Sequence, residues 1–241
     1  MVDQRLVSAV RSEKLLGVIV NDNLNWKDHL NGNNDHCGLI VDLSRRMGVL
    51  KQLRNYLPAS KFRQVVSGIF FSKLIYCMSV WIGIWGLHGQ HEEGMKSAIS
   101  KADIYRLQVL QNKVMRLILK CDRWTPTSTL LEKTKFLSVH QLGAYHTALQ
   151  VFKTHRTKKP SYHFERLFGR NENDETSILT RSSVHKESRV EFKLSTCRSS
   201  FFYQGAKLWS VFPAEIKNCQ TDSQFRVKCR EWIRRNIKIR P

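Results

Sequence analysis

The fold class is decided by the stretch ISKADIYRLQVLQNKVMRLILK (Ile99–Lys120). Its apolar residues recur three or four positions apart, which is the spacing of one face of an α-helix. The neighbouring flank is cationic and carries Arg106, Lys113, Arg116 and Lys120. We call these four residues the basic stripe. The pattern predicts an amphipathic helix with one side facing a core and another side positively charged.

Helical spacing continues on both sides of this stretch. Apolar periodicity and capping residues predict helices over 35–57, 60–85, 125–135 and 138–156, and a last helix that begins at Thr221. Ser138 with Gln141, and Thr221 with Gln224, have the spacing of a capping box. The predicted fold is therefore mainly α, a helical bundle followed by a small α+β C-terminal subdomain.

Two short segments have β character. Leu15–Val20 is apolar and partly β-branched, and the polar turn Asn21–Asn23 closes it, so we predict one strand there. Val190–Leu194 alternates between apolar and polar residues, with Phe201–Tyr203 as its candidate hairpin partner. The polar stretch Gly169–Ser188 is typical of a linker. We therefore expect a remnant strand over 1–23, a helical bundle over 24–168, a linker over 169–188 and an α+β subdomain over 189–241.

The segment Gly68–Leu87 is long and apolar enough to cross a bilayer. Lys73 is its only charge, and a lysine near the bilayer centre costs about 2.5–3.5 kcal/mol. Basic residues lie on both flanks, so no orientation follows. We predict the buried central helix of a bundle, and no membrane partner.

The charge balance points to a polyanionic partner. Forty Lys and Arg against twenty Asp and Glu give a formal net charge of +20, and nucleic acid is the commonest partner of such a field. The alternative is a solvated basic surface, or a piece of a larger protein whose other part is acidic. The six cysteines lie far apart without a CxxC pair, which favours a reduced protein of the nucleus or cytoplasm.

Residues for metal binding or catalysis are not indicated. His29, His36 and Cys37 form one candidate set and His88 with His91 another, but neither has the spacing that closes a zinc tetrahedron. Asp22 ends a predicted strand, where the turn preference of aspartate explains it. Glycine-rich phosphate loops and sets of nucleophile and base are missing from the sequence. We predict no cofactor, no metal and no small-molecule substrate.

Four blocks in order carry a resemblance to a known family. They are KLLGVIVNDNLNWKDHL (Lys14–Leu30), IFFSKLIYCMSVW (Ile69–Trp81), LQNKVMRLIL (Leu110–Leu119) and YQGAKLWSVFPAEIKNCQTDSQFRVKCREWI (Tyr203–Ile233). With these blocks the chain resembles the thumb and downstream C-terminal region of non-LTR (LINE-type) retrotransposon reverse transcriptases. Ser210 and Phe212 depart from the pattern of the last block, where the family has Asn and Leu.

The resemblance implies a thumb-like helical bundle that grips an RNA template or RNA–DNA hybrid by phosphate contacts. Such a polymerase holds two metal ions with paired aspartates, and the sequence has no adjacent Asp pair. We therefore expect a nucleic-acid-binding part that is no enzyme by itself, with RNA, RNA–DNA hybrid and, in a longer chain, the polymerase palm as partners. The alternative is a host-adopted or degenerate retroelement fragment that acts as a protein-interaction scaffold.

Cationic residues on rigid helices are the candidate contacts, because a thumb holds phosphates and reads few bases. We expect Trp124 to cap the core, with stacking on an exposed base as the alternative, and we expect Trp26, Trp81, Trp85, Trp209 and Trp232 to be packing residues. The first set comprises the basic stripe with Arg123 and Trp124. The second set comprises Arg230, Arg234, Arg235, Lys238 and Arg240.

Overall fold

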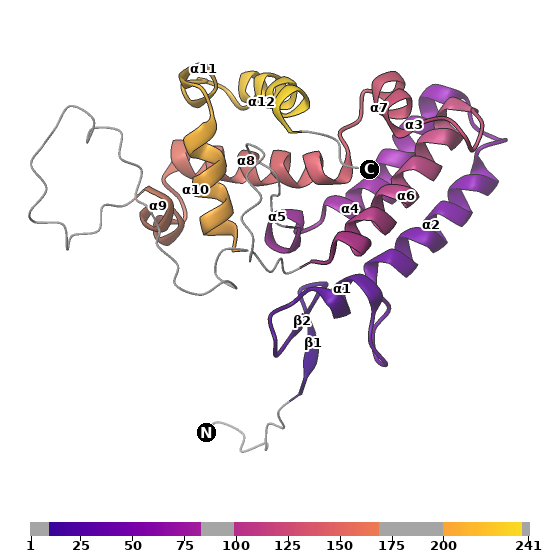
Figure 1. Ribbon diagram of the computed structural model, residues 1–241, viewed down its shortest axis with the longest axis horizontal. Helices are drawn as coiled ribbons and strands as arrows, with labels where there is room; N and C mark the ends of the chain where they lie inside the picture. Colours follow the sequence, from indigo (N-terminus) through magenta and orange to yellow (C-terminus); the bar gives the residue numbers. More distant parts are fainter. Residues whose placement is uncertain (1–9, 83–98, 169–199, 238–241) are drawn as a thin grey trace, which may run out of the picture.

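The computed structural model describes residues 10–82, 99–168 and 200–237. In these ranges 69% of the residues are helical and 6% form β structure. The predicted fold class, mainly α with a small β part, is confirmed. Figure 1 shows a group of helices on one side, a long central helix, and the C-terminal helices across it.

Two long helices form the frame of the first half. α2 (Leu39–Leu53) and α6 (Lys101–Leu119) pack against each other, and both start at the end where the N-terminal hairpin lies (Figure 1). At that end, Asn31 Nδ2 donates to Asp103 Oδ1 at 3.4 Å. At the far end, the buried Arg54 donates from Nε to the Leu117 carbonyl at 2.7 Å. The helices predicted over 35–57 and 99–120 are confirmed, with somewhat shorter bounds.

The apolar segment that follows α2 is not one helix. It comprises α3 (Ala59–Val66), the π-helical turn η1 (Ser67–Phe71), α4 (Ser72–Ile75) and α5 (Met78–Trp81). Cys77 has the left-handed φ of 50°, which ends the helix, and Trp81 Nε1 then donates to the Tyr76 carbonyl at 2.9 Å. The prediction of a single helix over 60–85 is therefore wrong, because a left-handed residue cannot be carried inside an α-helix.

One side of this segment supplies the centre of the first core. Phe62, Phe70, Leu74 and Trp81 are fully buried and pack with residues of α2 and α6. By length and composition alone, Ala59–Trp81 could also cross a membrane. Apolar core helices pass the same test. The prediction that this segment is buried in the middle of the bundle is confirmed only for the side that packs against α2 and α6.

A β-hairpin precedes the bundle. β1 (Ser12–Leu15) pairs antiparallel with β2 (Val18–Asn21), and the turn between them holds Leu16 and Gly17 at φ of 47° and 84°. The prediction of one strand over Leu15–Val20 is wrong because this turn divides it. Asp22 lies exposed in the next turn, as predicted. The hairpin is fastened to the bundle by Tyr76, whose hydroxyl donates to the Leu16 carbonyl at 2.7 Å.

Three helices lead from α6 into the second half, namely α7 (Thr127–Thr134), α8 (Val139–Thr157) and α9 (Ser161–Phe168). The capping box at the start of α8 is confirmed. Ser138 Oγ accepts from the Gln141 backbone at 3.3 Å, and Gln141 Oε1 accepts from the Ser138 backbone at 3.1 Å. Helix α9 was not predicted as a separate element, because the sequence shows only one clear helix end near Pro160.

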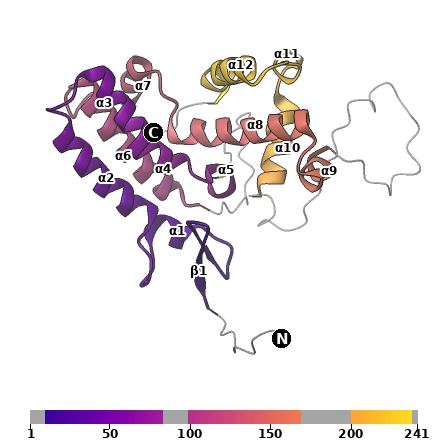
Figure 2. The same cartoon turned by 180° about the vertical axis from the view of Figure 1, so that it is seen from behind.

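The C-terminal helices pack on α8. They are α10 (Phe201–Val211), α11 (Ala214–Lys217) and α12 (Asp222–Asn236), and Figures 1 and 2 both show α12 running along α8. The predicted hairpin partner Phe201–Tyr203 is wrong, since it forms the first turn of α10. Ser200 caps that turn by accepting from the Tyr203 backbone at 3.4 Å. The predicted strand Val190–Leu194 and the linker 169–188 lie outside the described residues.

The final helix has half of its predicted capping box. Thr221 Oγ1 accepts from the Gln224 backbone at 3.2 Å, so the helix begins where predicted. The Gln224 side chain, however, accepts from the Gln220 backbone at 3.3 Å instead of the Thr221 backbone. The helix end is therefore capped through one more residue than the motif implies.

The hydrophobic cores divide the chain at the start of α8. The second core joins residues from both sides of the predicted boundary at 169–188, among them Val151 and Phe152 of α8 with Leu208 and Phe225. Phe152 and Phe225 stack face to face, with ring centroids 4.0 Å apart. Residues 200–237 thus share a core with α8 and α9, and the described part of the predicted subdomain 189–241 is helical.

The close approach of α8 to the end of α5 predicts that a side chain at Gly143 destabilises the fold. A Cβ on Gly143 would lie 2.4 Å from Cγ2 of the buried Ile82, so one of the two helices would have to shift. We expect Gly143→Ala to lower the free energy of unfolding by about 1–3 kcal/mol. Gly48→Ala, on an exposed face of α2 with open space at Cβ, should raise it by about 0.5–1 kcal/mol. Urea denaturation measures both, and the Gly143→Ala loss should shrink in an Ile82→Ala background.

The buried His29 predicts a pH dependence of stability. His29 Nδ1 accepts from the Ile19 backbone at 3.4 Å, and burial, then the charge of Lys73, lower its pKa from 6.5 to about 4. Between these pH values the unfolded chain binds the proton more strongly, so the stability present above pH 6.5 is lost as pH falls towards 4. The full loss is about 3 kcal/mol. Urea midpoints at pH 7, 5.5 and 4.5 should show a smaller decline for His29→Gln than for the wild type.

Candidate nucleic-acid interface

The exposed flank of α6 carries the basic stripe. Arg106 to Lys120 extends over about 21 Å at the rise of an α-helix. Lys113 and Lys120 are exposed, and neither forms an ion pair with any described residue. These two ammonium groups are available to an external anion.

Arg106 is partly committed to the fold. Its guanidinium donates to Asp103 Oδ1 at 3.2 Å and to the Asn31 side chain, so it joins α6 to α1 (Lys27–Asn31). Its side chain remains half exposed. The carboxylate neutralises much of its charge, which makes Arg106 a weaker phosphate contact than the two free lysines.

Arg116 has a structural role that the sequence did not reveal. Its Nη2 donates to the Thr125 carbonyl at 2.9 Å, and its Nε is buried without a hydrogen-bond partner. One helical turn earlier, Asn112 Nδ2 donates to Thr127 Oγ1 at 2.8 Å. These two contacts hold the loop between α6 and α7 against the flank of α6. Arg116 therefore positions the site more than it presents charge.

The loop held in this way presents a cation and a large ring. The Arg123 guanidinium lies 4.6 Å from the centroid of the Trp124 indole, and Trp124 is 79% exposed. The expectation that Trp124 caps the core is wrong, because most of the ring lies in solvent and it packs on Arg123. We call Lys113, Lys120, Arg123 and Trp124 the α6–α7 corner.

The other tryptophans follow the prediction where the structure describes them. Trp81 and Trp209 are buried, and Trp26 and Trp232 pack partly buried against the two cores. Trp85 lies outside the described residues. An exposed tryptophan at the α6–α7 corner is therefore set apart from the packing role of the others.

The second predicted set is less available. Arg230 lies over the Tyr145 ring at 5.3 Å, and Arg234 donates to the Lys135 carbonyl at the end of α7. Partial burial and then the Arg230 charge lower the pKa of Arg234. Arg235 is exposed, and Lys238 and Arg240 lie outside the described residues. The structure thus brings α12 to α7, but it does not place these residues on the flank of α6.

Two exposed aromatic residues were missed by the sequence analysis. Tyr105, 58% exposed, lies on the same flank of α6 as Arg116, eleven residues or about three turns away. Tyr56, 83% exposed, follows α2 at the end that Arg54 ties to Leu117. The polar flank of the helix could have signalled Tyr105. Nothing in the local sequence signals Tyr56, whose place depends on the packing of α2 with α6.

The chemistry of the α6–α7 corner suits the binding of a polyanion. In the described ranges, His, Cys, Asp and Glu side chains do not gather in threes around a possible metal position. Cations separated by one or two helical turns can contact successive phosphates, and an exposed indole can stack on a base. Both contacts are tolerant of sequence.

The different duties of two stripe residues predict different costs. Arg116→Ala removes the donor to Thr125, and we expect the free energy of unfolding to fall by about 1–3 kcal/mol. Lys113→Ala, on the same flank and without an ion pair, should change it by less than about 0.5 kcal/mol. Urea denaturation of both variants checks this, and equal costs would contradict the positioning role of Arg116.

No protein-family model, curated protein or solved structure matches the chain. The quoted blocks therefore have to be judged by what their residues do in the fold. The first and second blocks contact each other, because Tyr76 donates to Leu16 and the Trp81 ring packs at 5.8 Å against His29. These contacts explain why such residues occur together, while the resemblance to reverse transcriptases stays a prediction.

Proposed function

We propose that the chain binds single-stranded or duplex polynucleotides, RNA and RNA–DNA hybrid above all, through the α6–α7 corner. The observation that carries the proposal is the pairing of an exposed Trp124 with Arg123 on the loop that Arg116 binds. On the same flank of α6 as Arg116, Lys113 and Lys120 form no ion pair with a described residue. An indole left in water exposes a large apolar surface, which a base would cover. The surrounding cations would hold the adjoining phosphates.

The net charge of +20 supports the same proposal. Such a field speeds the encounter with a polyanion and makes affinity depend on salt. Within this proposal the chain acts as the duplex-gripping part of a retrotransposon RNA-directed DNA polymerase whose catalytic residues are supplied elsewhere. That origin rests on the four sequence blocks.

A protein-interaction scaffold is the second candidate function. The turn of the hairpin favours it, because the adjacent Leu15 and Leu16 are 65% and 84% exposed there. Neighbouring apolar side chains in water are typical of a contact with another protein. Under this proposal the chain would show no salt-dependent binding to polynucleotides.

A salt series separates the two candidates. We expect fluorescence anisotropy with single-stranded RNA, duplex RNA and RNA–DNA hybrid to show affinities that fall steeply with salt. The slope of the logarithm of the binding constant against the logarithm of the salt concentration measures the phosphate contacts. The triple change of Lys113, Lys120 and Arg123 to Gln should reduce the magnitude of this slope for single strands by about 2. Trp124→Ala should weaken single-strand binding by about 1–3 kcal/mol.

Matched variants serve as controls. Lys27, Lys101 and Lys159 are exposed lysines away from the corner, and their joint change to Gln removes the same charge. Tyr162→Ala removes another exposed ring. If the control triple variant reduces the salt dependence of affinity as much as the triple variant of the α6–α7 corner, the charge acts from the whole surface. The proposal that the corner is the binding site would then be wrong. If the chain does not bind polynucleotides even at low salt, the nucleic-acid proposal is wrong and the protein-interaction scaffold remains.

A further inference from the structure

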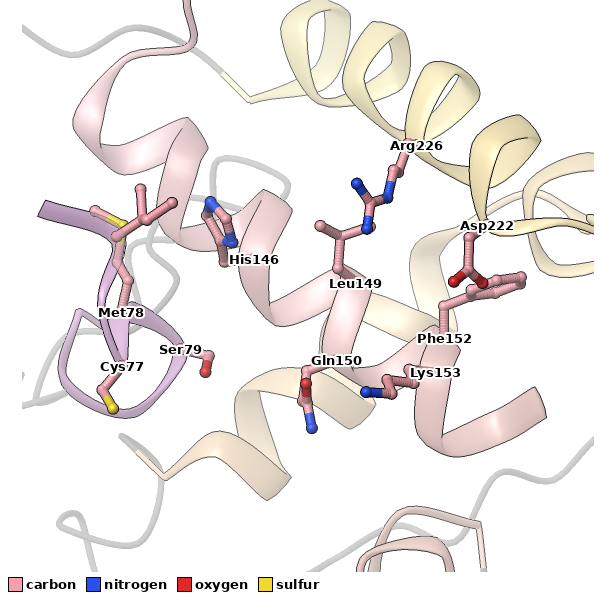
Figure 3. A pocket seen from close by; sticks show the side chains of 11 residues that line it. Cys77, Met78, Ser79, His146, Leu149, Gln150, Phe152, Lys153, Asp222 and Arg226 are labelled. Atoms are coloured by element: carbon pink, nitrogen blue, oxygen red, sulfur yellow. The ribbon is translucent and has the colours of Figure 1, made fainter. Parts of the chain in front are cut away.

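A second feature lies away from the α6–α7 corner, in the space where α5, α8 and α12 meet. A cavity of about 300 Å³ opens there, and Figure 3 shows side chains entering it from all three helices. Its polar lining comes from Ser79, His146, Gln150, Lys153, Asp222 and Arg226. We call it the α5–α8–α12 pocket.

The two cations of this pocket form no ion pair within the described ranges. Neither Lys153 nor Arg226 forms an ion pair with a described residue. The one carboxylate in the lining, Asp222, is bound by Arg156 from outside the pocket at 2.7 Å. Asp222 therefore offers little compensation to the two free cations. The pocket thus carries an excess of positive charge, and Lys153 and Arg226, which are both exposed, can be reached by an anion from solvent.

The positive charge near the pocket also acts on His146. Burial, followed by the charges of Arg226 and Arg230, lowers its pKa. The neutral ring keeps one N–H donor and one acceptor. An anion in the pocket would relieve the repulsion that the cations exert on this ring.

The rest of the lining is apolar and rigidly placed. Ile75, Met78, Leu149 and Phe152 contribute to it. The left-handed Cys77 sets the direction of α5, and the Phe152–Phe225 stack fixes α12 on α8. The walls are therefore held by the fold itself, and both apolar and cationic side chains line the cavity: Figure 3 shows Leu149 beside Arg226 and Phe152 beside Asp222.

We propose that the α5–α8–α12 pocket binds a phosphate monoester. Lys153 and Arg226 contact the phosphate oxygens with charge-assisted hydrogen bonds, and apolar lining residues such as Met78 and Leu149 contact the organic group. A free mononucleotide and the 5′-phosphorylated end of a polynucleotide share this chemistry. The pocket is built from other helices than the α6–α7 corner, so the proposal stands independently of the proposed function.

Calorimetric titration of the full chain with adenosine 5′-monophosphate tests the pocket. We expect saturable binding at one site, with adenosine giving none. Lys153→Gln and Arg226→Gln should each raise Kd at least about tenfold, while Lys101→Gln should leave it within twofold. The Tm of the two pocket variants without ligand should stay near that of the wild type, because neither side chain holds an ion pair. Absence of binding, or binding that ignores both substitutions, overturns the proposal.

Oligonucleotides distinguish the source of the phosphate. We compare the affinities of a 5′-phosphorylated and a 5′-hydroxyl single strand. If only the affinity of the phosphorylated strand depends on Lys153 and Arg226, the pocket binds the phosphorylated end of a polynucleotide. Equal dependence of both strands would mean that the pocket contacts internal phosphodiesters, and the monoester proposal is overturned. Trp124→Ala should leave mononucleotide binding unchanged, so failure at the corner does not imitate failure at the pocket.

Discussion

Three amide side chains buried on α6 hold the two halves of the molecule together. Gln108 donates to Gln111 and to Asn112, both at 2.9 Å, and accepts from the Val139 backbone at 2.9 Å. Gln111, which is fully buried, donates to the Leu137 carbonyl at 2.7 Å. Burying any one of these groups without a hydrogen-bond partner would cost about 1–3 kcal/mol of folding free energy. Because every amide depends on the next, α7 and the start of α8 have one position relative to α6.

The surface chemistry follows from that position. Asn112 reaches Thr127 and fixes the start of α7, and Arg116 reaches Thr125 in the loop before it. The loop held by these contacts carries Trp124 with its ring 79% exposed. In the other direction, α8 carries His146 and Lys153 to the place where α12 runs along it. Both candidate sites therefore depend on the same buried polar contacts.

Periodicity sufficed to predict α2, α6 and α12, and the capping box located α8, which is buried on most of its sides. It failed where the deciding interaction comes from elsewhere in the chain. The break at Cys77 depends on contacts of Tyr76 with the hairpin and of Trp81 with the preceding turn. Phe201–Tyr203 has strand-like residues, yet packing on α8 makes it helical. Charge was located correctly on α6, but the sequence could not tell Arg116, which holds a loop, from Lys113, which holds nothing.

That difference sharpens the meaning of the block LQNKVMRLIL. Leu110 and Ile118 lie in the first core, Gln111 and Asn112 belong to the amide network, and Arg116 binds the loop. The fold alone accounts for each of these residues. Lys113 is the one polar residue of the block that the fold leaves without a partner, although a helix of this kind tolerates many residues at an exposed position. If the block has a function beyond folding, Lys113 and the loop that Arg116 turns towards solvent are where it must act.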